Sequence, residues 1–590
     1  MGHLISSLIE NVEATAKSDE IKSYVTGELY ALTDLGPEDR VDLNALREAM
    51  GVMQHHDAIT GTEKEHVAHD YARILSKGIE ECEFITASAL SKIVAPSEKP
   101  KLMDEPVPAI PFISCPLLNV SQCEFSETSD SFVVTIYNPL SRPVNKYIRL
   151  PVSKAKYSVR DSSGTQLATQ IIPIATPVLE IPGRESSATI ELIFQAKDIA
   201  PLGFKSYFIE KTEEDIVIEQ KELDNYTQKL LDAAFKINEE TGLISGIVMN
   251  NRELAFKQEF LYYNGFVGNN DTSIEDTNSA FYTDSNGREM LKRIRNFRPT
   301  WRLDLEEPIS GNYYPVTSKI VIKGGDDEVA VLTDRAQGGT SLKDGHIELM
   351  LHRNCLHDDA FGVNEPLIEE AFDRGLVARG SHYLIVGSPT TSNPGGKTAA
   401  AQERDLAQKK LLSAWTFLSP TNGLTYDQYK NKYRMEFAGL KRALPDNVQI
   451  LTLEPWKGFS LLLRLEHVLE NDEDPNLSVP AIIDLKNLFS PFEIKSLRET
   501  TLGANQWLSE NHRLQFETAG NLEDLLNGNY QILDEDEEES RNKLNSEQSD
   551  SRNYVKRETL VEVPDSTDNF EITFQPMQIR TFVIEINKNS

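Results

Sequence analysis

The sequence has 590 residues, too many for one hydrophobic core, and its 39% apolar and 26% charged residues are typical of globular domains. Its formal net charge of −32 would repel a phosphate backbone, so nucleic-acid binding is not expected. No apolar run reaches the roughly 18 residues that a membrane span needs. The charge fits a protein of an acidic compartment, although acidic chains are also common elsewhere.

Residues 1–95 are predicted to form a small helical bundle. Asp42 is expected to cap the first clear helix, which carries apolar side chains at helical spacing. These side chains are Leu43, Leu46, Met50 and Met53. A second helix is expected to open at Thr62, whose hydroxyl would pair with Glu65 in a capping box. A third helix is predicted over residues 84–94.

A proline-rich linker at 96–112 separates the bundle from segments with the alternating period of strands. These segments lie at 131–140, 146–152, 188–196, 205–211, 319–325, 328–334, 346–352, 382–388, 448–454, 459–470, 491–502 and 570–586. Such a series is typical of β-sandwich layers, and one helix near Ala399 to Leu412 is expected to interrupt it. The predicted fold is therefore mixed, with a small N-terminal helical bundle followed by a large all-β region of β-sandwich domains.

We predict two parts in the β region, one or more β-sandwich domains at 113–440 and a C-terminal β-sandwich domain at 441–590. Within the C-terminal part, the acidic run DEDEEE and the polar stretch after it predict a solvated loop at 534–557. This loop has no central glycine with alternating ligands, so a calcium site is not expected there.

Cys115 and Cys123 flank the stretch PLLNVSQ, a turn-capable segment that a disulfide could close. Four glycosylation sequons are present, at Asn119, Asn225, Asn270 and Asn476. A sequon inside a candidate disulfide loop favours the secretory pathway. The first residues nevertheless lack the basic region and the uninterrupted apolar run of a signal peptide, so the natural N-terminus is expected to lie elsewhere.

His55, His56 and Asp57 are adjacent at the break between two predicted helices. Imidazole suits Zn²⁺, and a neighbouring carboxylate can orient a ligand or bind a hydroxyl group. Taken alone, the motif fits a structural role of either histidine better than a metal site, because zinc needs three or four protein ligands.

The residues around this motif change that balance. Residues 48–74, EAMGVMQHHDAITGTEKEHVAHDYARI, closely resemble the helix-turn-helix segment of family 38 α-mannosidases, most of all their lysosomal branch. Further stretches resemble the same enzymes, in the same order, over nearly the whole chain. They are IYNPLSRPVNKYIRLPV, FYTDSNGREMLKR, GNYYPV, VLTDRAQGGTSLKDGHIELMLHR, DDAFGVNEPL, LLLRLEHVLE, LRETTLGANQ and PMQIRTF.

The resemblance implies a zinc-dependent retaining glycosidase that removes terminal α-D-mannose from the glycans of glycoproteins, in the lysosome or after secretion. It implies one Zn²⁺ for each full-length enzyme, and His56 is the only one of its ligands that this sequence matches. His55 is expected to shape the substrate pocket and Asp57 to hydrogen-bond a mannose hydroxyl. Arg353 is expected to form part of the wall of the site.

The sequence departs from the family where the chemistry is concerned. No segment resembles the N-terminal His-x-Asp zinc motif or the segment that carries the nucleophilic Asp, so no catalytic residue is identified. Between Asn270 and Ala280 the family has several strands and an active-site tyrosine, whereas here the flanks are joined directly. The part at 113–440 is therefore expected to have a truncated middle.

Two smaller departures concern single residues. The family usually has a second arginine after the one matched by Arg353, where this sequence has Asn354 followed by Cys355. Cys82 resembles a family cysteine whose partner lies upstream, and no upstream cysteine is present. Cys82 and Cys355 are therefore expected to be unpaired.

A retaining glycosidase needs two carboxyl groups, one on each side of the glycosidic bond, so this chain alone is expected to be inactive and to bind zinc weakly. Three interpretations stay open. The chain is an incompletely translated α-mannosidase, a noncatalytic carbohydrate-binding or scaffold protein, or a subunit that completes its zinc site with a separately encoded N-terminal chain.

Overall fold

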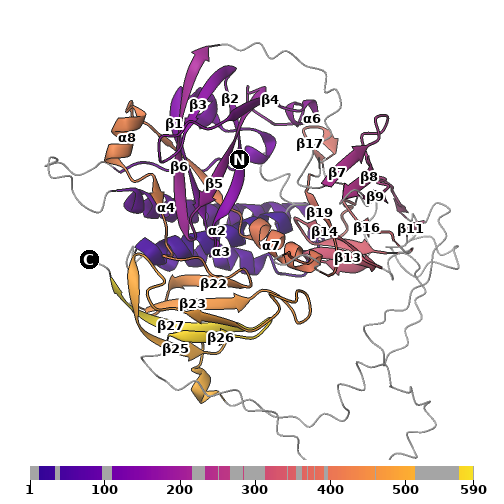
Figure 1. The fold of residues 1–590 in the computed structure, drawn as a ribbon. Coiled ribbons are helices and arrows are strands. Elements are labelled where there is room, and N and C mark those ends of the chain that lie inside the picture. The colour runs from indigo at the N-terminus through magenta and orange to yellow at the C-terminus, as the bar shows by residue number, and fades with distance from the viewer. Residues whose placement is uncertain are drawn as a thin grey trace, which may run out of the picture.

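The computed structural model describes residues 12–33, 40–95, 109–214, 233–249, 252–265, 283–284, 313–353 without 342 and 344, 362–390 without 369, 376 and 378, 396–511 without 459, and 570–588. Helices form a central layer with a β-sandwich on each side, and smaller sheets lie beside them (Figure 1). Within these ranges, no helix combines the length and the apolar character that crossing a bilayer requires.

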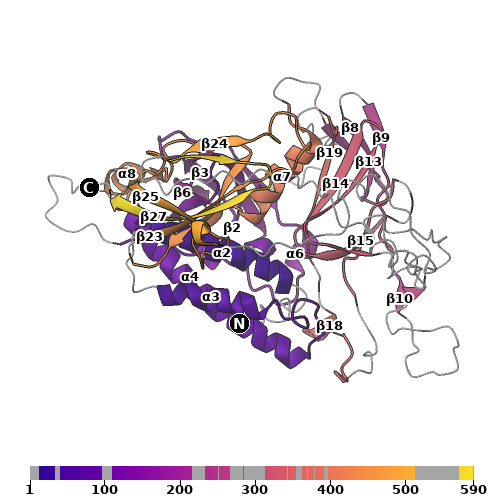
Figure 2. The ribbon, with the colours of Figure 1, turned by 90° about the horizontal axis from the view of Figure 1, so that it is seen from below.

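The helical layer is built from long helices that follow one another in the chain. They are α2 (Val12–Thr33), α3 (Arg40–Val52) and α4 (Glu65–Val94). Viewed from below, α3 and α4 run side by side (Figure 2). The predicted apolar stripe faces this contact, since Leu43, Leu46 and Met53 are all buried.

Three details of the predicted bundle are wrong. α3 begins at Arg40, so Asp42 lies inside its first turn instead of capping it. α4 is one helix where two were expected, because buried residues recur along its whole length and keep it packed on its neighbours. The cap position of α4 is Lys64, without a side-chain cap bond, while the hydroxyl of Thr62 binds Asp57.

The first sandwich pairs two antiparallel sheets, of order β20-β1-β6-β21, with β3 also on β6, and β2-β5-β4. The strands are β1 (Ser131–Asn138), β2 (Val144–Val152), β3 (Ala155–Arg160), β4 (Thr169–Pro173), β5 (Ile190–Ile199), β6 (Gly203–Glu214), β20 (Trp415–Pro420) and β21 (Glu436–Phe437). Inward side chains such as Phe132 and Phe194 form the core between the sheets. The opposite face of β1 is buried as well, because Val133 and Tyr137 pack with Val25 and Leu29 of α2.

Smaller antiparallel sheets fill the chain between β6 and β20 and lie to one side of the helical layer in both views (Figures 1 and 2). Their orders are β7-β8-β9, β10-β11, β12-β15-β16, β13-β14-β19 and β17-β18. Their strands are β7 (Ala233–Ile237), β8 (Ile244–Met249), β9 (Arg252–Ala255), β10 (Asn264–Gly265), β11 (Thr283–Asp284), β12 (Tyr314–Val316), β13 (Lys319–Gly324), β14 (Asp327–Thr333), β15 (Gln337–Thr340), β16 (Glu348–Leu349), β17 (Glu370–Ala371), β18 (Arg374–Gly375) and β19 (His382–Gly387). The predicted helix near 399–412 is α7 (Ala399–Leu411), which packs on β14 and β19.

The C-terminal sandwich pairs the sheets β22-β23-β27-β25 and β24-β26. Its strands are β22 (Val448–Pro455), β23 (Ser460–His467), β24 (Ala481–Asp484), β25 (Phe492–Thr500), β26 (Glu571–Phe574) and β27 (Ile579–Lys588). Leu463, Phe492 and Phe582 are part of its core, and Ala31 and Leu32 of α2 pack into the same core. α2 therefore contributes side chains to the packing of both sandwiches.

Short helices and a disulfide complete the described structure. The helices are η1 (Leu118–Val120), α5 (Glu124–Thr128), α6 (Thr176–Leu179), α8 (Tyr426–Lys432) and η3 (Leu508–Glu510). The predicted disulfide joins Cys115 to Cys123, with 5.5 Å between their Cα atoms. Cys82 is buried and takes part in no disulfide with a described residue, while Cys355 lies outside the described residues.

The predicted fold class is confirmed, since helices come first and sheets arranged as sandwiches follow. The predicted domain boundaries stay predictions. The acidic loop at 534–557, most of the linker at 96–112 and the join between Asn270 and Ala280 lie outside the described residues.

Candidate functional site

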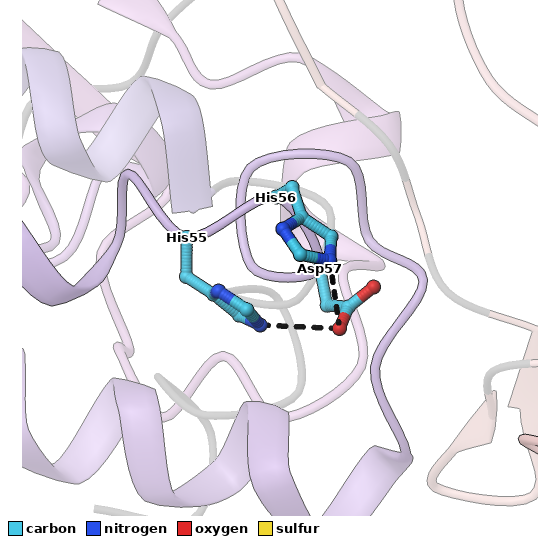
Figure 3. A group of neighbouring side chains, drawn as sticks. All are labelled: His55, His56 and Asp57. Carbon is cyan, nitrogen blue, oxygen red and sulfur yellow. Dashed lines mark hydrogen bonds and ion pairs between the residues drawn. The ribbon is translucent and has the colours of Figure 1, made fainter.

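The predicted site residues lie on the turn that connects α3 to α4. α3 ends at Val52 and α4 begins at Glu65, so His55, His56 and Asp57 occupy the start of the connection (Figure 3). Gly61 has a φ of 64°, a left-handed conformation that glycine adopts without strain. The chain reverses there, and the amide of Thr62 donates a 3.0 Å hydrogen bond back to the carbonyl of Asp57.

Asp57 is the centre of this turn. Its Oδ2 lies 3.1 Å from His55 Nε2 and 3.8 Å from His56 Nε2, as the dashed lines in Figure 3 show. The hydroxyl of Thr62 donates a 3.0 Å hydrogen bond to the other oxygen, Oδ1. This bond is the largest cause that lowers the pKa of Asp57, and the two histidines add to it. The turn therefore holds an ionised carboxylate between imidazole rings.

The three side chains present their donor atoms to solvent. The exposed fraction of the side chain is 44% for His55, 84% for His56 and 44% for Asp57. Their ligand atoms all lie within 4.8 Å of one another. Two imidazoles and a carboxylate are donors that Zn²⁺ prefers, so this set fits one side of a zinc site. Since Asp57 also orients His55, His56 is the imidazole with the most open approach.

A segment almost 300 residues further along the chain contacts the same turn. The Arg353 guanidinium donates hydrogen bonds of 2.8 Å to the carbonyl of Thr60 and 3.4 Å to that of Gly61. The Glu365 side chain accepts a 3.0 Å hydrogen bond from the amide of Glu65, at the start of α4. The segments that follow β16 and precede β17 thus lie against the helical turn, and the Arg353 guanidinium binds the backbone of that turn.

Sequence reasoning did not single out Glu63, which lies beside this cluster. Burial raises the pKa of its carboxyl, the charge of Asp57 adds to the effect, and Arg353 opposes it. Neither of its carboxyl oxygens accepts a hydrogen bond from another described residue. No motif marked this position, because its proximity to Arg353 follows only from the long-range contact.

The structure thus brings four predicted site residues together. His55, His56 and Asp57 lie on one turn, and the Arg353 guanidinium binds a backbone carbonyl of that turn. The roles assigned to them stay predictions. Among the sequons, Asn119 and Asn476 are exposed, as glycan attachment requires. Asn225 and Asn270 lie outside the described residues.

Comparison with known families matches three parts of the chain. Residues 8–93 match the Alpha mannosidase middle domain, 270–361 the Glycosyl hydrolases family 38 C-terminal domain, and 447–582 the Glycosyl hydrolases family 38 C-terminal beta sandwich domain. The first of these matches contains the turn with His55, His56 and Asp57, and the second contains Arg353.

Curated proteins with similar sequences include lysosomal alpha-mannosidases of mammals. The protein of Bos taurus is 36% identical over 572 residues, covering 82% of this chain and 54% of its own length. That of Cavia porcellus is 33% identical over 650 residues, covering 94% of this chain and 58% of its own length. The human protein is 33% identical over 594 residues, covering 84% of this chain and 56% of its own length. The chain thus spans little more than half the length of these relatives.

Solved structures agree at the level of the fold. The crystal structure of an alpha-mannosidase from Enterococcus faecalis V583 has a TM-score of 0.51 at 9% sequence identity, covering 99% of this chain and 68% of that chain. The family is shown by the sequence identity to the mammalian relatives and by the three domain matches. The chain belongs to glycosyl hydrolase family 38, of which it carries the middle domain and the C-terminal domains.

Proposed function

We propose that this chain is the C-terminal part of a zinc-dependent retaining α-mannosidase that removes terminal α-D-mannose from glycoprotein glycans. The observation that carries the proposal is the turn in which His55, His56 and Asp57 meet with their donor atoms exposed. The similarity of most of the chain to lysosomal alpha-mannosidases supports it.

Each residue of the turn takes a role that its geometry allows. His56, the most exposed of the three, is the zinc ligand. Asp57 is kept ionised by Thr62 and accepts a hydrogen bond from a mannose hydroxyl, while His55 holds the carboxylate in place. Arg353 fixes the backbone of Thr60 and Gly61 and so keeps the turn at the site wall.

A bound zinc ion supplies Lewis-acid chemistry, polarising oxygen atoms of the sugar. Retaining hydrolysis also needs a carboxylate nucleophile and an acid/base on opposite sides of the bond. No residue of this sequence matches the nucleophile of the family, and Asp57 matches a substrate-binding position. We therefore expect this chain alone to bind α-mannosyl glycans weakly and not to hydrolyse them. The partner that completes the site is an N-terminal α/β domain with the remaining zinc ligands.

The cellular location follows from the same proposal. A disulfide between Cys115 and Cys123 persists in oxidising compartments, and Asn119 inside its loop is exposed for glycosylation. The net charge of −32 suits an acidic lumen, where part of the carboxylates are protonated. We place the mature protein in the lysosome or outside the cell.

Calorimetry with zinc and turnover of an aryl α-mannoside test the proposal. The chain alone should bind zinc weakly and show no turnover. His56→Ala should abolish the zinc signal, and His346→Ala, which removes an exposed histidine outside the turn, should leave it unchanged. Mixing with the N-terminal domain of a lysosomal α-mannosidase should restore zinc-dependent turnover.

Two outcomes would contradict this function. Hydrolysis by the isolated chain that is lost in Asp57→Asn would make Asp57 the nucleophile. Tight binding of mannosyl glycans by the completed assembly, without turnover, would favour the noncatalytic carbohydrate-binding interpretation.

A further inference from the structure

Glu28 is a carboxyl group buried at the centre of the molecule. It lies on α2, between the two sandwiches, and its exposed fraction is 0%. Its Oε2 accepts a 3.1 Å hydrogen bond from the hydroxyl of Tyr137 on β1. Its other oxygen, Oε1, has no hydrogen-bond partner among the described residues. The Glu28 carboxyl therefore accepts one hydrogen bond on Oε2, and its Oε1 has no partner among the described residues.

Tyr24 extends the contact to the opposite side of the helical layer. It lies one turn before Glu28 on α2, close enough to lower the pKa of the Glu28 carboxyl. Its hydroxyl donates a hydrogen bond to the carbonyl of Ile450 on β22. Polar contacts of α2 thus reach the first sandwich through Glu28 and Tyr137, and the C-terminal sandwich through Tyr24 and Ile450.

No cation compensates a charge on Glu28 among the described residues. Burial raises the pKa of Glu28 well above its usual value, and the hydrogen bonds from the two tyrosines only partly oppose it. The pKa values of Tyr24 and Tyr137 are raised as well, chiefly by burial, so both phenols stay neutral donors.

The arginines on the surrounding elements pair with other carboxylates. Arg47 of α3 pairs with Glu454 of β22, and Arg142 after β1 pairs with Asp405 of α7. Glu466 of β23 faces Tyr24 and raises its pKa, so it brings a negative charge and no compensation. α4 meets α2 through an uncharged contact, a 2.9 Å hydrogen bond between Thr86 and Thr26. An ionised Glu28 would therefore be a buried charge held by two phenol groups alone.

We propose that a proton on Glu28 holds α2 against β1 of the first sandwich, so that this junction is tightest in acid and loosens as the pH rises. With the proton on Oε1, the neutral carboxyl still accepts the hydrogen bond from Tyr137 and brings no charge into the junction. Loss of the proton leaves a negative charge in a fully buried junction. The inference does not depend on the proposed glycosidase activity.

The direction of the pH effect follows from proton counting. In the unfolded chain Glu28 releases its proton near pH 4.5, whereas the folded chain keeps it to a higher pH. Between these two values the folded state binds more protons than the unfolded state. This contribution to stability is complete below the unfolded pKa and is lost as the pH rises towards the folded pKa. The ratio of folded to unfolded chains then falls by up to tenfold for each pH unit.

Urea unfolding of the full chain at a series of pH values from 4.5 to 8 tests the proposal, with Glu28→Gln as the main variant. The glutamine amide keeps one acceptor and supplies a donor without a titrating proton, so it mimics the protonated carboxyl. The variant should match the wild type at pH 4.5 and exceed it as the pH rises, by up to tenfold in the folded ratio per unit. Glu80→Gln, which removes an exposed carboxyl of α4, should follow the wild type throughout.

Parallel pH profiles for Glu28→Gln and the wild type would overturn the proposal. If Glu28→Gln does not fold, Tyr137→Phe tests the proposal instead. This variant leaves the proton on Glu28 and removes the hydrogen bond from Tyr137 to Glu28. Its unfolding midpoint should be lower in acid while the pH dependence remains, and loss of that dependence would contradict us. The protection of β1 amides against hydrogen exchange, measured relative to the intrinsic base-catalysed rate, adds a local measurement. It should fall as the pH rises in the wild type and stay constant in Glu28→Gln.

Discussion

α2 and the turn between α3 and α4 belong to the same helical layer, but their polar side chains differ in burial and in hydrogen-bond partners. On α2, Thr26 and Glu28 are fully buried and bonded to groups of other elements. On the turn, His55, His56 and Asp57 are exposed and bonded mainly within the turn.

The contrast separates scaffold from site. Removing a buried polar or apolar group leaves a cavity or an unpaired partner, so α2 should dominate stability. Exposed side chains that bond to near neighbours add little to folding, so the residues of the turn are available for binding. Arg353, which contacts the turn from a distant segment of the chain, is the exception, because its hydrogen bond to Thr60 joins that segment to the helical layer.

The largest effect is expected for Leu29→Ala on α2. Leu29 is 0% exposed and packs in the cluster that joins α2 to β1, β6 and α8. Truncation should lower the free energy of unfolding by about 2–5 kcal/mol, as measured by urea denaturation. Phe84→Ala is the control, since Phe84 on α4 is 74% exposed and its loss should change stability by about 0.5 kcal/mol or less. Equal losses would mean that α2 is not the central packing element.

An intermediate effect is expected where α3 and α4 touch most closely. A Cβ added at Gly78 would lie 2.8 Å from the Cα of Leu46, so the two helix backbones would have to separate. Gly78→Ala should therefore lower stability by about 1–3 kcal/mol, although alanine is the better helix former. Gly51→Ala near the end of α3 meets no atom within 4 Å and should raise stability by up to about 1 kcal/mol. A stabilising Gly78→Ala would show that the helices can move apart freely.

Sequence patterns predicted the presence of helices and strands better than their first and last residues. β14 and β26 alternate buried and less buried positions, which is the signal that period-two reasoning detects. The two helices predicted over residues 62–94 are the single helix α4, because buried residues along its whole length, including Gly78 against Leu46, keep it packed on its neighbours. β16 is far shorter than the alternating segment at 346–352, so a strand-like pattern did not ensure a paired strand.

The sequence predicted only the part of the candidate site that is local in the chain. His55, His56 and Asp57 are adjacent in the chain, so a local motif identified them. Their bonds to Thr62, and those of Thr60 to Arg353, depend on how the turn folds and on a contact across 293 residues. No local pattern encodes such a contact, and Thr62 was accordingly assigned to a helix cap.

The smallest effect on stability is expected for His56→Ala, although this change should abolish zinc binding. The His56 side chain is 84% exposed, and its nearest ionic contact is 3.8 Å from Asp57, so its removal should change the free energy of unfolding by about 0.5 kcal/mol or less. His467 is a matched histidine with the opposite setting, 1% exposed and within hydrogen-bonding distance of Leu469, Val479 and Asn447. His467→Ala strands these buried groups and should cost about 1–3 kcal/mol in the same urea titration. Since both variants lose one imidazole, the difference between them measures the burial of His467 together with its hydrogen bonds. A large loss for His56→Ala in zinc-free buffer would mean that the turn is part of the scaffold, and the separation of scaffold from site would fail.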